Sequence, residues 1–412
     1  MKQPRQARRL PPQPWISEAP TQRVLAALAA GEAEARFVGG SVRDALLGRE
    51  IGDIDIATPA PPERVIELLG TAGIKVVPTG LAHGTVTAVA APRHFEITTL
   101  RRDVETYGRH ARVAFDADWA ADASRRDFTM NAVYLAPDGT LFDPVGGIAD
   151  LRAGRVRFVG DPARRIAEDV LRLLRYYRFE ASFGKTRSGD PAARAACRAA
   201  RDRLPTLSAE RVRQELMKLF DATDPLPALA MMREDGVLAA VLPEARRFDR
   251  LKNLVAIEPA RDPLRRLAAA IETGSEGALA LAGRLRFPNA WRDRLAGLVP
   301  PWPLDPAADE RAQRRALHRV GAARYRDITL ILAAGGALAP ARLRELSALA
   351  DNWTAPRFPL KGRDVTALGV LPGERVGRLL EAVRQSWEEG DFAASRAECL
   401  ARLKALVGEA AQ

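Results

Sequence analysis

The stretch FVGGSVRDALLGREIGDIDIAT, residues 37–58, brings two glycines, an arginine and two aspartates close together along the chain. Phe37 and Val38 end an apolar run, which indicates a strand. Gly39 and Gly40 permit a tight turn in which another group can approach the backbone closely. The stretch therefore predicts a strand followed by a glycine turn.

A short helix is predicted directly after the glycines. Ser41 followed by Asp44 resembles a capping box, and Gly48 supplies the residue at which such a helix closes. The start of a helix binds anions, and Arg43 in the first turn adds a mobile cation beside it. Taken together, these features predict a phosphate site, although a glycine pair before a helix also occurs in ordinary turns.

The segment GDIDIA, residues 52–57, predicts a strand with two carboxylates on one face. Residues two apart on a strand project to the same side, so Asp53 and Asp55 share a face while Ile54 and Ile56 anchor the other. Such a carboxylate pair, together with phosphate oxygens and water, is a typical ligand set for Mg²⁺. The alternative is an exposed strand with solvated acids.

The length and charge of the chain limit the class of protein to which it can belong. A chain of 412 residues is long enough for two to four domains. The net charge of +11 favours a polyanionic partner such as nucleic acid. Arginine outnumbers lysine, which a GC-rich coding sequence explains equally well, so charge alone leaves the partner open.

The cysteine content and hydropathy indicate a cytoplasmic protein. Cys197 and Cys399 stand alone, without the spacing of a disulfide framework or a zinc site. No apolar run is long enough for a bilayer span, so no membrane association is expected. The four histidines are too scattered for a metal cluster, and no obligate protein partner is predicted.

The chain changes character near residue 145. Before that point, strand patterns at ARFVGG, DIDIAT, IKVVPTG, GTVTAVAA, HFEITTL and NAVYLAP alternate with helical patterns, and beyond it helical spacing dominates. The predicted fold class is an α+β head, with a mixed sheet and flanking helices, followed by all-α domains. The predicted domains are a flexible N-terminal arm (1–20), a catalytic head (21–145), a neck (146–225), a helical body (226–350) and a helical tail (351–412).

The glycine turn, helix and paired aspartates are similar to those of the nucleotidyltransferase superfamily of DNA polymerase β. That resemblance implies a third acid on a later strand, for which Glu96 is the candidate. The segment SRRDFTMNAVYLAPDGTLFDPVGGIADLRAGRVRFVGDPARRIAEDVLRLLRYYRF, residues 124–179, further resembles the bacterial and eukaryotic type of CCA-adding tRNA nucleotidyltransferase. The resemblance implies template-independent, Mg²⁺-dependent addition of C, C and A from CTP and ATP to the 3′ end of tRNA, with release of pyrophosphate.

The same resemblance implies roles for residues of the head. Gly39, Gly40, Arg43 and Arg126 are expected to bind the incoming nucleotide, Arg126 near its sugar and phosphates. Asp127 is expected to bind the nucleotide and to help distinguish ribose from deoxyribose.

The segment EDVLRLLRYYRF, residues 168–179, predicts a reader of the nucleotide base. On one helix, Asp169 and Arg172 would share a face. An ionised Asp only accepts hydrogen bonds and an Arg only donates them, so the pair fits cytosine and adenine and rejects uracil and guanine. Arg175 and Arg178 are expected to reach the triphosphate or the tRNA end. The alternative is an ordinary salt bridge between Glu168 and Arg172.

Three further segments resemble parts of the same family. Residues 100–115 are similar to a flexible loop that full CCA-adding enzymes use when they switch from C to A addition. Residues 207–220 are similar to a helix that braces the neck, in which Arg211, Glu215 and Lys218 would pair along one helix face. Residues 358–383, which include Lys361 and Arg363, are similar to the tail region and are expected to contact the tRNA elbow.

Three rival functions remain open at this point. A poly(A) polymerase, or an enzyme that adds only CC or only A, would share the head. A small-molecule nucleotidyltransferase would not need the Asp–Arg reader and the long helical body. A non-catalytic RNA-binding protein on the same scaffold would be expected to have lost an acid or the reader, and this chain keeps them.

Overall fold

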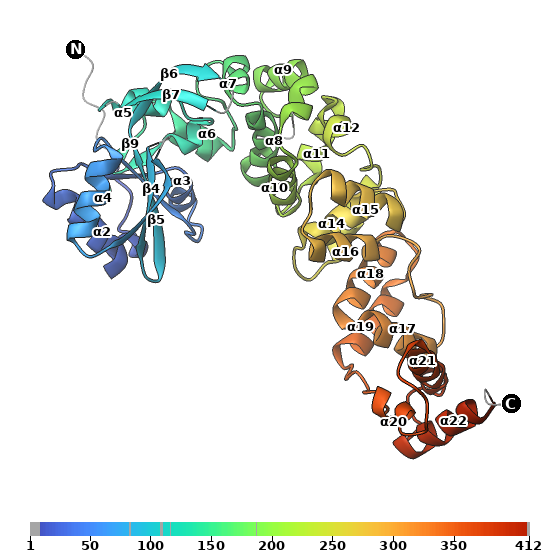
Figure 1. Ribbon diagram of the computed structural model, residues 1–412. Coiled ribbons are helices and arrows are strands. Elements are labelled where there is room, and N and C mark those ends of the chain that lie inside the picture. Colours follow the sequence, from blue (N-terminus) through green and yellow to red (C-terminus); the bar gives the residue numbers. More distant parts are fainter. Residues whose placement is uncertain (1–8, 82–83, 108–109, 116, 187, 410–412) are drawn as a thin grey trace, which may run out of the picture. The chain divides into compact units, whose positions relative to one another are not determined.

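A computed structural model describes residues 9–81, 84–107, 110–115, 117–186 and 188–409 (Figure 1). The chain divides into two compact units, residues 1–243 and 244–412. The strands of the described residues all lie in the first unit, and the described residues of the second unit form helices and connections. The predicted fold class, an α+β head followed by helices, is confirmed.

The head is built on a seven-stranded sheet with the order β3-β4-β5-β2-β1-β8-β9. β2 and β5 run parallel, and the other neighbours run antiparallel. Each segment predicted to be a strand forms one, and β9 is an addition that the sequence pattern does not indicate. The strands are β1 (Arg36–Val38), β2 (Ile54–Thr58), β3 (Lys75–Gly80), β4 (Thr85–Ala90), β5 (Arg93–Thr99), β8 (Tyr134–Leu135) and β9 (Leu141–Phe142).

The two faces of the sheet carry different side chains. Ile54 and Ile56 are buried in the main hydrophobic core together with Phe95, as the alternation predicts. The helices α2 (Ala19–Ala30) and α4 (Pro62–Thr71) contact the strands of this sheet and contribute to the same core (Figure 1). Alternate residues of a strand point to opposite faces, so Asp55 of β2 points away from this core.

The N-terminal segment packs on the head from residue 9 onward. The Leu10 amide donates a hydrogen bond to the Gly139 carbonyl at 2.9 Å. Trp15 of α1 (Pro14–Ser17) is buried, with its ring centre 4.7 Å from that of Phe37 in an edge-to-face arrangement. The prediction of a flexible arm is therefore wrong for residues 9–20, because their apolar side chains complete the core. Residues 1–8 lie outside the described residues.

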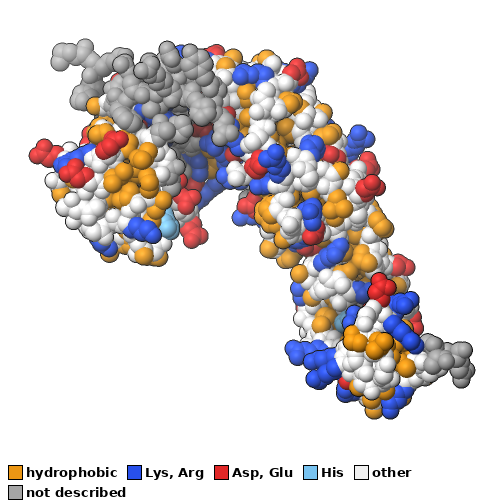
Figure 2. Space-filling model, in the orientation of Figure 1, with side chains coloured by type: hydrophobic (Ala, Val, Ile, Leu, Met, Phe, Trp, Pro, Cys, Tyr) orange, Lys and Arg blue, Asp and Glu red, His pale blue; other side chains and the backbone are white. Residues whose placement is uncertain are grey.

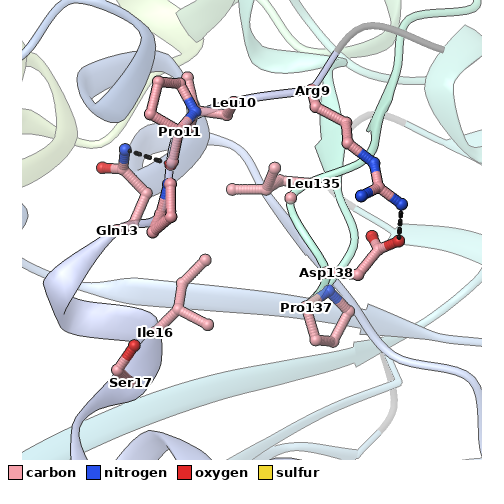
Figure 3. Close-up of a pocket in the computed structure, with 11 residues that line it drawn as sticks. Arg9, Leu10, Pro11, Gln13, Ile16, Ser17, Leu135, Pro137 and Asp138 are labelled. Carbon is pink, nitrogen blue, oxygen red and sulfur yellow. Dashed lines mark hydrogen bonds and ion pairs between the residues drawn. The ribbon is translucent and has the colours of Figure 1, made fainter.

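A pocket of about 520 Å³ lies between this N-terminal segment and the β8–β9 turn (Figure 3). An ion pair of 3.1 Å between Arg9 and Asp138 spans one side of it. Leu10, Ile16 and Leu135 are among its lining residues. The predicted site residues are not among them, so this pocket is separate from the candidate active site.

The segment predicted to be a flexible loop forms a second, two-stranded sheet. β6 (Arg101–Tyr107) and β7 (His110–Phe115) pair antiparallel, with Arg101 opposite Phe115. The two residues at the turn, 108–109, lie outside the described residues. The backbone of this segment is thus a hairpin, and a part in the switch from C to A addition stays a prediction.

Helix α8 joins the head to the neck. It packs on α10 and α11, and its residue Phe179 lies 4.6 Å, ring to ring, from Phe128 of the RRDF segment. The remaining helices of the first unit are α3 (Gly40–Leu46), α5 (Trp119–Ser124), η2 (Thr129–Asn131), α6 (Gly147–Ala153), α7 (Pro162–Glu168), α8 (Leu171–Phe183), α9 (Pro191–Ala200), η3 (Arg201–Thr206), α10 (Ala209–Phe220), α11 (Leu226–Glu234) and α12 (Val237–Val241).

The second unit is helical. Its first part buries Arg266 against Glu258, with 2.5 Å between guanidinium and carboxylate, and its last part has a separate core around Trp387. Blue side chains gather toward its C-terminal end (Figure 2), where Lys361 and Arg363 are exposed. The helices are α13 (Phe248–Ile257), α14 (Pro263–Ala270), α15 (Ser275–Arg284), α16 (Asn289–Leu298), α17 (Glu310–Val320), α18 (Ala322–Ala334), α19 (Pro340–Asp351), α20 (Gly362–Thr366), α21 (Glu374–Glu389) and α22 (Arg396–Glu409).

Two further features of the described residues concern membrane spans and cysteines. None of their helices is both long and apolar enough to span a bilayer. Cys197 and Cys399 are both buried and free, as the sequence predicts.

Candidate active site

The glycine turn after β1 brings the backbone against a carboxylate. Gly39 has a φ of +73°, and a Cβ at this position would lie 2.9 Å from Oδ2 of Asp55. Only glycine combines this conformation with such a close approach. The predicted capping box is wrong, because Gly39 occupies the N-cap position and the Ser41 hydroxyl donates to the Val38 carbonyl at 3.2 Å.

A row of side chains crosses the sheet beside this turn. Asp55 of β2 lies opposite Val38 of β1 and Glu96 of β5, and Val38 in turn lies opposite Tyr134 of β8. Neighbours in register project from the same face of a sheet. Glu96 therefore lies beside Asp55 on a later strand, and its part as a third acid stays a prediction. Asp53 precedes the strand, in an exposed bend.

The carboxylates of this row repel one another. Burial and the neighbouring charge of Glu96 raise the pKa of Asp55 to about 6, Asp53 adds to this rise, and Arg126 and Arg43 oppose it. No described residue donates a hydrogen bond to the side chain of Asp53, Asp55 or Glu96. A bound cation would relieve this excess of negative charge.

The donor set suits Mg²⁺ better than a metal that needs a protein cage. Within the described residues, no three His, Cys, Asp or Glu side chains gather closely enough to hold a metal by themselves. Mg²⁺ is commonly bound through one or two carboxylates, with water and substrate phosphates completing its shell. Asp53 and Asp55 fit this pattern, with Glu96 as a neighbouring charge.

Arg43 is held firmly rather than being mobile. Its guanidinium donates to the Asp44 carboxylate at 2.8 and 3.1 Å and to Oδ1 of Asn131 at 2.9 Å. It also lies 4.3 Å from the ring centre of Phe183. The expectation of a mobile cation is therefore wrong. Arg43 is instead a fixed positive charge that influences Asp55.

Arg126 is held by a buried carboxylate that the sequence analysis missed. Asp122, which is 1% exposed, accepts hydrogen bonds from Arg126 at 2.9 and 3.1 Å, from Arg125 at 2.8 Å and from the Tyr134 hydroxyl at 2.6 Å. Burial alone would raise the pKa of Asp122, but the two arginines outweigh burial and lower it. The spacing of three and four residues along a helical turn was the available signal.

Asp127 is fully occupied by protein donors. Its carboxylate accepts from the Phe128 amide at 2.8 Å, from Asn131 at 3.0 Å and twice from Arg175, at 2.5 and 2.8 Å. Burial would raise the pKa of Asp127, but Arg175 and these hydrogen bonds lower it to about 2. A carboxylate offers roughly four acceptor positions, so none is left for a ribose in this arrangement.

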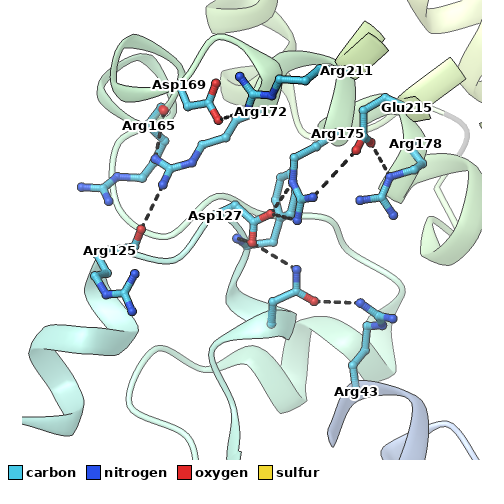
Figure 4. Close-up of polar contacts among 12 residues, drawn as sticks. Arg43, Arg125, Asp127, Arg165, Asp169, Arg172, Arg175, Arg178, Arg211 and Glu215 are labelled. Atoms are coloured by element: carbon cyan, nitrogen blue, oxygen red, sulfur yellow. Dashed lines mark hydrogen bonds and ion pairs between the residues drawn. The ribbon is translucent and has the colours of Figure 1, made fainter. Parts of the chain in front are cut away.

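These contacts form a continuous polar chain across the site (Figure 4). Arg43 donates to Asn131, Asn131 donates to Asp127, and Asp127 accepts from Arg175. The chain continues to Glu215 of α10, which lies 3.8 Å from Arg175 and accepts from Arg178 at 2.5 Å. Arg175 and Arg178 are thus fixed by carboxylates of other segments.

Asp169 and Arg172 do not lie on one continuous helix. Asp169 is extended, with φ −149° and ψ 109°, in a break between α7 and α8. Its Oδ1 accepts from the Leu171 amide at 3.1 Å, and its Oδ2 accepts from Arg211 at 2.7 Å. The expected helical face is therefore wrong in detail, and the helix is interrupted where the carboxylate accepts from the amide of Leu171, the first residue of α8.

Arg172 is oriented by three protein acceptors. It donates to Glu168 at 2.6 Å, to the Arg165 carbonyl at 3.0 Å and to the Arg125 carbonyl at 3.1 Å. The salt bridge with Glu168, weighed above as the alternative, is thus present. The contact with Arg125 places Arg172 beside the segment whose next residue, Arg126, lowers the pKa of Asp55 through its charge.

Two charged residues of the brace helix α10 pair with residues of other segments. Arg211 holds Asp169, and Glu215 holds Arg178. The predicted pairing of Arg211 and Glu215 with each other is wrong, because each finds a partner of opposite charge across the helix interface. No local sequence signal indicates these long-range partners.

Two known protein families match parts of this chain. Residues 35–157 match the family described as "Poly A polymerase head domain". Residues 190–248 match the family described as "Probable RNA and SrmB- binding site of polymerase A".

Relatives in animals and bacteria carry related names. The mitochondrial CCA tRNA nucleotidyltransferase 1 of Mus musculus is 33% identical over 393 residues, which cover 90% of this chain and 86% of the relative. The human protein of that name is 33% identical over 389 residues, with the same coverage. The CCA-adding enzyme of Anoxybacillus flavithermus is 40% identical over 213 residues, or 51% of this chain and 52% of the relative.

Solved structures share the fold over most of the chain. The Bacillus stearothermophilus CCA-adding enzyme in complex with CTP has a TM-score of 0.77 at 27% identity, with 96% of this chain and 99% of that chain covered. The Thermotoga maritima CCA-adding enzyme complexed with tRNA has a TM-score of 0.62 at 19% identity, with 94% of this chain and 95% of that chain covered. The second likeness shows the fold alone.

We expect Gly39→Ala to destabilise the protein more than Gly48→Ala. Both glycines have a positive φ, but a Cβ at position 48 meets no atom within 4 Å, whereas one at position 39 meets Asp55. The Gly39 variant should lose roughly 1–3 kcal/mol more of the free energy of unfolding, measured in urea. It should also displace the carboxyl carbon resonance of Asp55 in an NMR spectrum. Equal losses in the two variants would contradict the close approach.

We expect Asp55→Asn to stabilise the metal-free protein at pH 8 and much less at pH 4.5. The pKa of Asp55 is higher in the folded protein, about 6, than the ordinary 3.8. Folding is therefore favoured by protonation, and this contribution is lost as the pH rises through 6. The free energy of unfolding, measured in urea with a chelator, should rise by about 1–3 kcal/mol at pH 8.

The matched control for this experiment is Asp161→Asn. Asp161 is an exposed N-cap residue of α7, and Asn caps helices equally well. It should leave the unfolding free energy nearly unchanged at both pH values. Destabilisation of the Asp55→Asn variant at pH 8 would show that the carboxylate is not under repulsion.

Proposed function

The chain belongs to the family of CCA-adding tRNA nucleotidyltransferases, and we propose that it adds C, C and A to the 3′ end of tRNA, using CTP and ATP. The observation that carries this proposal is that an oriented acceptor, Asp169, and an oriented donor, Arg172, lie three residues apart, with Arg172 in contact with the segment that contains Arg126. Such a pair allows the protein to choose the base without a nucleic-acid template.

The hydrogen-bond inventory of the pair supports this role. An arginine has five N–H donors, and protein acceptors use three of those of Arg172. A carboxylate has roughly four acceptor positions, and protein donors use two of those of Asp169. Each side chain is thus oriented and keeps unused capacity, and each is partly exposed, at 17% and 28%.

The chemistry of the base edges then selects the monomer. Cytosine and adenine each present an amino donor next to a ring-nitrogen acceptor, which match Asp169 and Arg172. Uracil and guanine present a carbonyl next to an N–H, which place acceptor against acceptor and donor against donor. Each polar group left unpaired in a desolvated site costs about 1–3 kcal/mol, a factor of about 5 to 150 in discrimination.

The carboxylates and the first arginines serve the transfer of the nucleotide. Mg²⁺, when held by Asp53 and Asp55 with Glu96 nearby, would polarise the triphosphate and favour the attacking alkoxide. Arg43 and Arg126 bind the phosphates, and Gly39 and Gly40 let them approach the backbone. The 3′-oxygen of the tRNA bonds to the α-phosphorus, the bond to the pyrophosphate oxygen breaks, and the hydroxyl proton leaves to solvent.

The contacts of three further candidate residues support a role for each. Asp127 has no acceptor left for a ribose, so we assign it to orienting Arg175. Arg175 and Arg178 remain partly exposed, at 30% and 13%, and we assign them to the triphosphate or the end of the tRNA. The division into head, neck, body and tail remains a proposal of the same kind, with the exposed Lys361 and Arg363 of the tail at the tRNA elbow.

The rival functions differ from this proposal in measurable ways. A poly(A) polymerase or an A-only enzyme would not incorporate CTP, and a CC-only enzyme would not incorporate ATP. A non-catalytic RNA-binding protein would incorporate neither. A cytoplasmic location remains a prediction from the two isolated cysteines, and two relatives are named as mitochondrial.

We expect the protein with Mg²⁺ to incorporate CTP into tRNA that lacks CCA and ATP into tRNA that ends in CC. UTP and GTP should be incorporated at least about tenfold less efficiently, from the cost of unpaired polar groups. Radiolabelled single nucleotides, offered one at a time, provide the measurement. Asp53→Ala should abolish incorporation of both nucleotides while leaving tRNA binding intact, and a parent protein that incorporates no CTP would end the proposal.

We expect Asp169→Asn to lower the preference for CTP over UTP by about 5- to 100-fold. The amide can donate to the uracil carbonyl, which removes one of the two mismatches, while Arg172 still opposes the N–H of uracil. The ratio of kcat/KM for the two nucleotides is the quantity to measure. Asp161→Asn is again the control and should keep the ratio of the parent protein; an unchanged ratio in the Asp169 variant would exclude it from base selection.

A further inference from the structure

We propose that Asp122 and Tyr134 are positioning residues for nucleotide binding, which hold Arg126 in the orientation that faces the carboxylate row. The inference rests on the proposed function, because it assigns Arg126 to the incoming triphosphate. Asp122 is 1% exposed and Tyr134 is fully buried, so neither can touch the nucleotide. Their effect must pass through Arg126.

The contacts around Asp122 fix one edge of the Arg126 guanidinium. Oδ2 of Asp122 accepts from Nε and Nη2 of Arg126, at 3.1 and 2.9 Å. The same oxygen accepts the hydroxyl of Tyr134 at 2.6 Å, and that hydroxyl lies 3.3 Å from Nε of Arg126. Three groups thus meet at one oxygen, and Nη1 of Arg126 remains for another acceptor.

The sheet register fixes where this cluster lies. Tyr134 of β8 lies opposite Val38 of β1, which lies opposite Asp55 of β2. Tyr134 and Asp55 therefore stand in one cross-strand row, two strand spacings apart, or about 9.5 Å. The ring of Tyr134 packs against the guanidinium, with the ring centre 5.4 Å from Cζ of Arg126. The position of Tyr134 in the sheet therefore places Arg126 beside this cross-strand row.

The cluster carries an excess of positive charge, which suits an anion. Asp122 carries one negative charge and is shared by two arginines, Arg125 and Arg126. One positive charge is therefore not neutralised within the cluster. A triphosphate that approaches Asp55 meets a guanidinium that is already oriented and still attractive, so less ordering is required on binding.

A purely structural role is the competing explanation. Trp119 of α5 packs edge-on against Tyr134 at 5.2 Å, and Ala123 of the same helix belongs to the same small core. Loss of the Asp122 contacts could then loosen α5 without any specific effect on the nucleotide. The two explanations differ in whether the effect depends on Arg126.

The test is a double-mutant cycle between Tyr134→Phe and Arg126→Ala, measured as KM and kcat for CTP with tRNA that lacks CCA. Tyr134→Phe keeps the ring and removes only the hydroxyl. It should raise the KM for CTP about 3- to 10-fold, with a smaller change in kcat. In the Arg126→Ala background it should have no further effect on KM. Asp122→Asn should raise KM further than Tyr134→Phe, because the charge that holds Arg126 is lost.

Tyr177→Phe is the matched control. Tyr177 is equally buried, and its hydroxyl donates to a carboxylate oxygen of Asp235 at 2.8 Å. This variant should lower thermal stability to a similar extent and leave KM for CTP unchanged. The proposal is overturned if Tyr134→Phe behaves as Tyr177→Phe does, or if its effect on KM persists unchanged without Arg126. Failure of the parent protein to incorporate CTP would instead remove the proposed function.

Discussion

The site depends on arginines that are held in place by carboxylates of the same unit. A buried ion pair adds little net stability, because the desolvation of both charges offsets their attraction. Its value here is geometric, since a planar guanidinium held along one edge presents its remaining N–H groups in a fixed direction. A flexible arginine would lose side-chain entropy on each binding event. The pairs are Arg43–Asp44, Arg126–Asp122, Arg172–Glu168, Arg175–Asp127, Arg178–Glu215 and Arg211–Asp169.

The carboxylates expected to hold Mg²⁺ differ from these paired arginines in their contacts. Asp53, Asp55 and Glu96 have no arginine that donates a hydrogen bond to them among the described residues, and Asp55 is held against the backbone of Gly39. Burial and mutual repulsion therefore raise the pKa of Asp55. This local instability is the kind that a functional site retains, because a cation would relieve it when the nucleotide arrives. In the proposed function, the arginines held by carboxylates would bind the base and the phosphates, and the unpaired carboxylates would hold the metal.

Local patterns in the sequence predicted the parts of the site that local geometry controls. The alternation in GDIDIA placed Ile54 and Ile56 in the core and Asp55 on the other face, and the paired glycines located the turn. The helix break at Asp169 could not be predicted, because the break is stabilised by Arg211, 42 residues away. Asn131 and Asp122 were missed, and Glu215 was assigned the wrong partner. The contact of Glu215 with Arg178 is decided by the packing of α8 on α10, whereas Asp122 holds Arg126 through the local spacing of a helical turn.

The break between α7 and α8 explains how a side-chain pair could replace a template. In a continuous helix, Asp169 would be free to rotate about its side-chain bonds, and its carboxylate could pair with Arg172 itself. The extended backbone at Asp169 instead lets one oxygen accept from the amide of Leu171 and the other bind Arg211. Arg172 donates to two backbone carbonyls and to Glu168. The donor and the acceptor are therefore kept from neutralising each other, which is the condition under which both can meet a base edge.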